Sequence, residues 1–157
     1  MVAFKTLWDN HPGGASYPCD RTKFGNQCAI RMGVALRKSG VGLSGYRGKL
    51  CNEYADLSDH VPGHVRSAQE LANVFYRSPG LLGRGVKTKL LRGTVNANMA
   101  VMENVKGVVF IANGWGSTDH IDVWDGDTKT MKGVNTSSGY YGNNGQQLYV
   151  WDLTGIA

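Results

Sequence analysis

The chain has 157 residues, 41% of them hydrophobic and 18% charged, a composition typical of one globular domain with a buried core and unlike that of a disordered chain. Its formal net charge of +5 is spread along the sequence, with a loose basic group between Arg84 and Arg92, so no nucleic-acid-binding stripe is indicated. No apolar run approaches the length of a membrane span. We therefore expect a single domain over residues 1–157.

The first half of the chain predicts helices. Residues 1–25 are punctuated by Pro and Gly and suggest an irregular lead-in without a signal-peptide core. From Cys28 to Lys38 apolar residues recur at helical spacing. Ser67 and Glu70 form a capping box before a second helix, which Pro79 ends.

The second half predicts strands. A continuous apolar run over 107–112 indicates a buried strand, and the alternating run 120–124 indicates the next. A further strand is expected within 129–135, a polar loop over 136–146, and a last strand from residue 147. Helices followed by an antiparallel sheet define an α+β fold, with the N-terminal helices packed on the C-terminal sheet.

Cys28 and His120 are the residues that point to chemistry. Cys28 opens the first predicted helix, where backbone N–H groups favour a thiolate and can stabilise an oxyanion. His120 begins a strand and can act as the base of a cysteine hydrolase. The two are 92 positions apart, so the prediction requires the fold to bring them together in an opening that solvent reaches.

The remaining histidines have weaker patterns. His11 falls in the predicted lead-in, away from any expected element. His60 and His64 have the spacing of a zinc-binding helix, but Pro62 and Gly63 between them exclude that helix.

The remaining cysteines leave two interpretations. The chain has no Cys-x-x-Cys motif, so neither a zinc nor a redox site is predicted, and no metal or cofactor is expected. Cys19 and Cys51 are either two separate buried thiols or a disulfide, which would imply an oxidising destination.

A third polar group normally orients the imidazole of a cysteine hydrolase. If the turn after the strand at 120–124 has two residues, Met131 lies opposite His120 and cannot serve. A six-residue loop instead places Asn135 opposite, and Asn135 is the predicted third catalytic residue. Asp122, which shares a strand face with His120, and Asp127 are the alternatives.

These motifs resemble a known family. The run from Asn26 to Met32, the Gly114–Gly116 and His120–Gly126 segments, and the closing Leu148–Trp151 are similar to the fourth group of type VI secretion amidase effectors. The resemblance implies a papain-like α+β fold and hydrolysis of the D-glutamyl–meso-diaminopimelate bond in peptidoglycan stem peptides. It also implies delivery by the type VI secretion apparatus without a cleaved signal peptide, action in the periplasm of a rival bacterium, and a cognate immunity protein.

Carried onto this sequence, the resemblance makes Cys28 the nucleophile and His120 the general base. Family members have an aspartate on the strand after the histidine, where the two-residue turn gives Met131. Some also have a disulfide in that hairpin, but here any bridge must join Cys19 and Cys51, because no cysteine lies beyond residue 51.

Two other functions fit the same residues. One is a different papain-like cysteine protease or transpeptidase, because the cleft walls rather than the dyad select the substrate. The other is a non-enzymatic module that binds the cell wall or a partner. Arg31, one helical turn after Cys28, would either meet a substrate carboxylate or form a structural ion pair.

Overall fold

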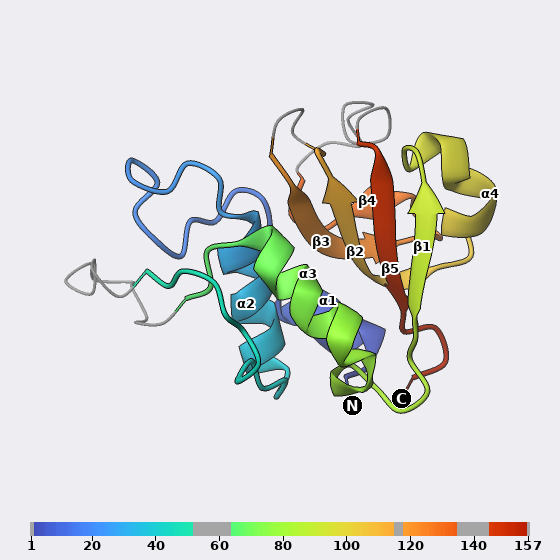
Figure 1. Ribbon diagram of the computed structural model, residues 1–157, viewed down its shortest axis with the longest axis horizontal. Coiled ribbons are helices and arrows are strands. Elements are labelled where there is room, and N and C mark those ends of the chain that lie inside the picture. Colours follow the sequence, from blue (N-terminus) through green and yellow to red (C-terminus); the bar gives the residue numbers. More distant parts are fainter. Residues whose placement is uncertain (1, 52–63, 115–117, 135–144, 157) are drawn as a thin grey trace.

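The computed structural model describes residues 2–51, 64–114, 118–134 and 145–156. Within these ranges three helices precede the strands: α1 (Phe4–Asn10), α2 (Cys28–Lys38) and α3 (Ala68–Arg77). A short helix and two 3-10 turns lie among the later elements: α4 (Met99–Met102), η2 (Pro79–Leu81) and η3 (Asn96–Asn98). Figure 1 shows α1, α2 and α3 grouped on one side of the sheet and α4 beyond its opposite edge.

The sheet has five strands: β1 (Thr88–Arg92), β2 (Lys106–Ala112), β3 (His120–Asp125), β4 (Thr130–Met131) and β5 (Gln147–Asp152). Their order is β1-β5-β2-β3-β4, and every neighbouring pair is antiparallel. The predicted α+β fold is therefore confirmed. The last strand in sequence inserts between β1 and β2, so the chain end completes the middle of the sheet (Figure 1).

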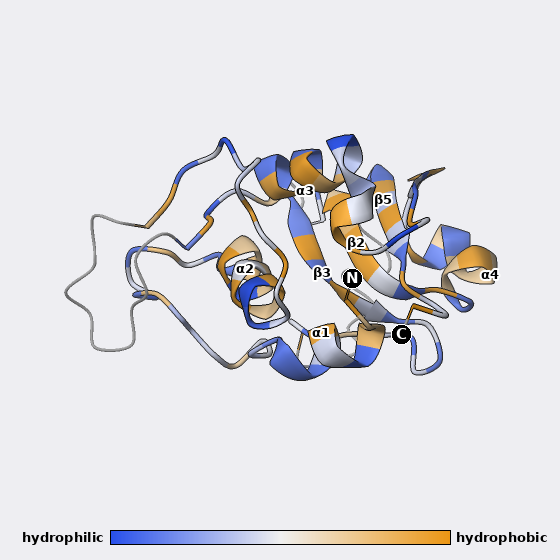
Figure 2. Ribbon diagram, turned by 90° about the horizontal axis from the view of Figure 1, so that it is seen from below, coloured by the Kyte–Doolittle hydropathy of each residue, from blue (hydrophilic) through white to orange (hydrophobic). Residues whose placement is uncertain are grey.

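Each face of the sheet buries a hydrophobic cluster, because side chains alternate along a strand. Val108 and Phe110 of β2 pack in the larger cluster with residues of α1, α2 and α3. Val109 and Ile111 face the other way, into a smaller cluster that includes Met102 of α4. Figure 2 shows the hydrophobic residues running along β2 and β3. Both faces of β2 are covered, as its continuous apolar sequence predicts.

Two of the helices follow the sequence prediction. Helix α2 spans Cys28–Lys38 as expected. At the start of α3 the Ser67 side chain accepts a 3.1 Å hydrogen bond from the Glu70 N–H, which is half of the predicted capping box. The expectation of an irregular lead-in was wrong for α1, whose Leu7 is buried against the core. With only seven residues, α1 is stabilised by this packing rather than by intrinsic helicity.

The hairpin between β3 and β4 decides the register that the sequence left open. Trp124 pairs with Met131 and Asp125 pairs with Thr130. This is the register of the longer loop, and the two-residue turn was wrong. Gly126 begins the turn where any side chain would collide with the backbone oxygens of Met102 and Val105. The short β4 therefore stands opposite the far end of β3 from His120.

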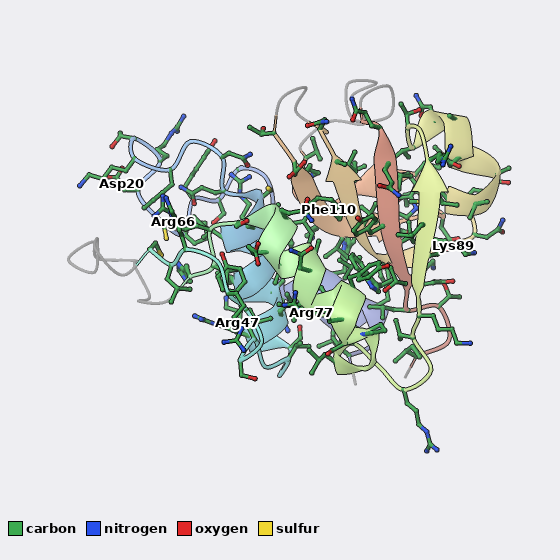
Figure 3. The ribbon with its side chains drawn as sticks, in the orientation of Figure 1. Asp20, Arg47, Arg66, Arg77, Lys89 and Phe110 are labelled. Carbon is green, nitrogen blue, oxygen red and sulfur yellow. The ribbon has the colours of Figure 1, made fainter. Side chains whose placement is uncertain are left out.

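The loose basic group lies around the edge strand β1. Lys89 and Arg92 are both exposed on this strand (Lys89 is labelled in Figure 3), where charged side chains discourage pairing with another sheet.

Among the residues that the structure describes, none of the helices is long and apolar enough to cross a membrane.

Candidate active site

Cys28 occupies the first turn of α2, where the helix presents backbone N–H groups. The Gln27 side chain just before it does not cap the helix; it binds the backbone of Cys19 and Phe24 instead. The Cys28 N–H donates to Asn26 Oδ1 at 3.3 Å, and its sulfur lies 3.7 Å from the backbone oxygen of Asp119. The sulfur thus sits at the positive end of a helix, beside the residue that precedes β3.

His120 is the first residue of β3, and the fold brings it to Cys28. Its Nε2 atom lies 2.8 Å from Asp122 Oδ2, and the Cys28 thiol lies beside the same ring, where it influences the His120 pKa. Helix α2 packs directly against β3, so packing of the core fixes this contact. The two side chains are buried rather than open to solvent as expected: Cys28 is 5% exposed and His120 is 1% exposed.

Asp122 is held by three hydrogen bonds in a fully buried position. Besides the contact with His120, its Oδ1 atom accepts from the backbone N–H groups of Val123 and Gly133, each at 2.8 Å. A Cβ atom at Gly133 would lie 2.7 Å from Asp122 Oδ2. Only glycine therefore lets the chain after β4 approach closely enough to bind this carboxylate.

The protonation states follow from these contacts. Burial is the largest influence on the His120 pKa and lowers it, but hydrogen bonds to Asp122 and Cys28, with the charges of both, raise the pKa from 6.5 to about 9. For Asp122, burial acts to raise the pKa, but His120, His11 and the Gly133 N–H hold it below its ordinary value. His120 and Asp122 therefore form a buried imidazolium–carboxylate pair at neutral pH.

His11 belongs to the same corner, although the sequence placed it in an irregular segment. It caps the C-terminal end of α1, is 4% exposed, and lies with Nε2 3.6 Å from Asp122 Oδ1. Its Nδ1 accepts a hydrogen bond from the Gly13 N–H, so the neutral ring carries its proton on Nε2. Burial is the main cause that lowers the His11 pKa to about 4; Asp122 opposes it, and the charge of Arg31 adds to it.

The other sequence-predicted site residues have different outcomes. Asn135 lies outside the described residues. Asp127 is an exposed residue of the β3–β4 turn, paired with Lys106, and was wrong as an alternative partner for His120. Among the described residues, the carboxylate that contacts the imidazole belongs to Asp122. The sequence signal for it was period-two spacing on one strand, which places positions 120 and 122 on the same face.

Arg31 is structural in this arrangement. It is buried, its Nε donates to the Ser16 backbone oxygen at 2.7 Å, and its guanidinium stacks over the Tyr17 ring. Among the described residues the Arg31 side chain makes these contacts in place of the predicted ion pair, and they attach the lead-in to α2. Trp124 is a core residue, with its Nε1 donating to the Met102 backbone oxygen at 2.8 Å.

The side chains of Cys28, His120 and Asp122 together can perform nucleophilic acyl transfer. A thiol beside a protonated imidazole at a helix start favours the thiolate, which is the reactive form of cysteine. A carboxylate on the far ring nitrogen fixes the tautomer and orientation of the imidazole. Backbone N–H groups around Cys28 are placed to stabilise an oxyanion.

Comparison with known proteins agrees with a cysteine amidase. The family described as type VI secretion system amidase effector protein 4, Tae4, matches residues 24–151, a range that includes Cys28, His120 and Asp122. This confirms the resemblance seen in the sequence motifs. None of the curated proteins matches the chain.

Solved structures match over nearly the whole chain. Tae4 from Salmonella typhimurium, in a structure with Tai4 described as an effector–immunity system, aligns with a TM-score of 0.67 at 14% identity, covering 98% of this chain and 99% of that one. Tae4 from Enterobacter cloacae aligns with a TM-score of 0.59 at 14% identity, covering 98% of this chain and 97% of that one. At this identity the likeness establishes the shared fold.

Proposed function

Because the chain belongs to the Tae4 family of type VI secretion amidase effectors, we propose that it hydrolyses peptidoglycan stem peptides with Cys28 as its nucleophile. The observation that carries this proposal is the placement of the Cys28 thiol, at the start of α2, beside His120, whose Nε2 contacts Asp122. Residues 1–157 act as one amidase domain.

The reaction begins with the sulfur. The Cys28 sulfur, paired with protonated His120, attacks the amide carbonyl carbon as a thiolate. The oxyanion of the tetrahedral intermediate is stabilised by backbone N–H groups at the start of α2. His120 then donates its proton to the leaving amine, which leaves a thioester on Cys28.

Hydrolysis of the thioester restores the enzyme. His120, now neutral, takes a proton from a water molecule as that water attacks the thioester carbonyl. The carboxyl product leaves and the thiolate–imidazolium pair re-forms. Asp122 keeps its charge throughout, and its bonds to the Val123 and Gly133 N–H groups hold it against the ring. The steps use side chains and backbone N–H groups of this chain, together with water.

The bond cleaved is the one between D-glutamate and meso-diaminopimelate, in the periplasm of the target bacterium. Its test is mass spectrometry of muropeptides after purified sacculi are digested with the protein. We expect fragments that end at a D-glutamyl carboxylate and begin at a free diaminopimelate amine. Fragments cut at another bond would refute this specificity.

Parallel digestions separate the rival functions. Casein cleaved in place of sacculi would indicate a general papain-like protease, and joined rather than shortened stems would indicate a transpeptidase. Protein that sediments with sacculi without releasing muropeptides would indicate a binding module. We expect release from sacculi and intact casein.

The immunity partner follows from the same family. Tae4 from Salmonella typhimurium is described as an effector–immunity system with Tai4. The same effector has also been crystallised with Tai4 from Enterobacter cloacae. A cognate immunity protein that covers the Cys28 corner would protect the producing cell in the same way.

A further inference from the structure

A second group of reactive side chains lies outside the site described above. Cys19 Sγ is 3.1 Å from Cys51 Sγ and 3.0 Å from His64 Nδ1, and the three donor atoms all lie within 4.8 Å of one another. All three residues are buried, and the two cysteines pack with Phe24 and Ile30 in a small cluster apart from the main core. The proposed amidase mechanism uses none of these residues.

The three residues are held in place by separate devices. An antiparallel bridge between Leu50 and Val65 brings Cys51 beside His64, and the Cys51 N–H donates to the His64 backbone oxygen at 3.1 Å. Cys19 is fixed from the other side, where the Gln27 side chain accepts from its N–H and donates to its backbone oxygen. Ligand atoms positioned before binding lose less conformational freedom when a ligand arrives.

A cavity of about 430 Å³ adjoins this group on the side of His64. His64 forms part of its wall, together with residues of the lead-in and of α2: Pro12, Ser16, Tyr17, Pro18, Val34, Arg37 and Lys38. Pro18 immediately precedes Cys19, so the cavity borders the cluster on two of its three segments. Arg66 and Asp20, labelled in Figure 3, mark this region on the side of the molecule away from the sheet.

We propose that Cys19, Cys51 and His64 bind a zinc ion, with a water molecule from the adjoining cavity as the fourth ligand. Thiolates and a neutral imidazole form a donor set that suits zinc, and three protein ligands leave one coordination position open. Zinc binding displaces the two thiol protons to solvent, so the site carries Zn²⁺ with two thiolates. A disulfide needs only the two sulfurs, whereas the His64 ring nitrogen beside Cys19 completes a ligand set.

No Cys-x-x-Cys motif marks these three residues in the sequence. The three ligands come from separate segments, and their spacing becomes informative only when the Leu50–Val65 bridge is known. Bound zinc would fasten the lead-in to the bridge. Through Gln27, which contacts Cys19 and directly precedes Cys28, it would also steady the start of α2.

The test is zinc binding by the reduced protein on a Cys28→Ala background, which removes the third thiol as a competing ligand. The protein is dialysed against zinc chloride with a phosphine reductant, and metal is measured by plasma mass spectrometry. We expect one zinc per chain, a higher melting temperature with zinc, and protection of Cys19 and Cys51 from alkylation. Adding Cys51→Ser should abolish stoichiometric binding.

A folded parent protein with reduced thiols that retains no zinc and alkylates equally with and without the metal would overturn the proposal. So would an intact mass lower by two hydrogens with no bound zinc, which identifies a disulfide pair. Alkylation protection in the parent decides the question even where Cys51→Ser fails to fold. Because the background lacks the proposed nucleophile, the result is independent of the amidase proposal.

Discussion

The Asp122 carboxylate lies 2.8 Å from Nε2 of His120, two positions earlier on the same strand. Both side chains project from one face of β3, so this contact does not depend on the register of the neighbouring strand. The pair is fully buried, and Asp122 is additionally bound by the Val123 and Gly133 N–H groups. The acid that orients the imidazole is therefore built into the strand that carries it.

Replacing this acid tests its role. In Asp122→Asn the amide oxygen would keep the Val123 and Gly133 N–H bonds, so the amide nitrogen would face His120 Nε2, which then has to accept a hydrogen bond and shift its proton to Nδ1. We expect kcat on sacculi to fall on the order of 1,000-fold, with the His120 pKa dropping from about 9 because the carboxylate no longer opposes burial. The rate of muropeptide release and NMR titration of His120 measure the two effects.

Asp127→Asn is the matched control, since Asp127 is an exposed aspartate of the following turn. It should leave both kcat and the His120 pKa unchanged. Equal activity of Asp122→Asn and Asp127→Asn would show that the buried carboxylate has no part in the reaction.

Gly133 is predicted to be intolerant of any side chain. A Cβ atom there would lie 2.7 Å from Asp122 Oδ2, so Gly133→Ala must displace either the carboxylate or the chain that binds it. We expect about a 10- to 100-fold loss of activity, as for other residues that orient a catalytic group. Gly42→Ala, at a position with open space around it, should retain full activity. Comparable rates for the two variants would contradict the expectation.

The stability of the protein should fall in mild acid because of His11. Its pKa is lowered from 6.5 to about 4 in the folded state, so between these pH values the unfolded chain takes up a proton that the folded chain does not. The free energy of unfolding should therefore decrease by about 3 kcal/mol as pH falls from 6.5 to 4. Urea unfolding of wild type and His11→Gln across this range measures it, and the variant should lack this portion of the decrease. Parallel curves for both proteins would refute the assignment.

The cap of α3 gives a local stability prediction. Ser67→Ala removes the acceptor of the Glu70 N–H and should lower the free energy of unfolding by about 1 kcal/mol. The rate of muropeptide release should stay unchanged under conditions where the variant is fully folded. Ser44→Ala, in an exposed turn, is the control and should change stability little. Chemical denaturation of both variants provides the comparison, and equal midpoints would mean that the cap contributes nothing.

How far the sequence predicts this protein depends on the range of the interactions. Helix α2, strand β3 and the Ser67 cap arise from local periodicity or capping, and local patterns identified each of them. Helix α1 was missed because it is short and is stabilised by tertiary packing of Leu7, which no local pattern reports.

The residues of the candidate site also divide into those with a local sequence signal and those placed by tertiary packing. Cys28 and His120 were predicted from a helix start and a strand, together with the family motifs. His11 reaches Asp122 only through the packing of α1, and Gly133 acts through a close backbone approach, so neither had a sequence signal. The strand opposite His120 favoured Asn135, which lies outside the described residues and stays a prediction. The carboxylate that contacts the imidazole among the described residues comes from the strand of His120 itself.

The most direct measurement of the central claim is the rate at which new amino termini appear when purified sacculi are incubated with wild-type protein and with Cys28→Ala. Circular dichroism first establishes that the two are equally folded. We predict release by the wild type and a loss of about 1,000-fold or more in the variant, because the thioester of the proposed reaction forms on the Cys28 sulfur. Release by a folded Cys28→Ala protein at the wild-type rate would contradict Cys28 as the nucleophile.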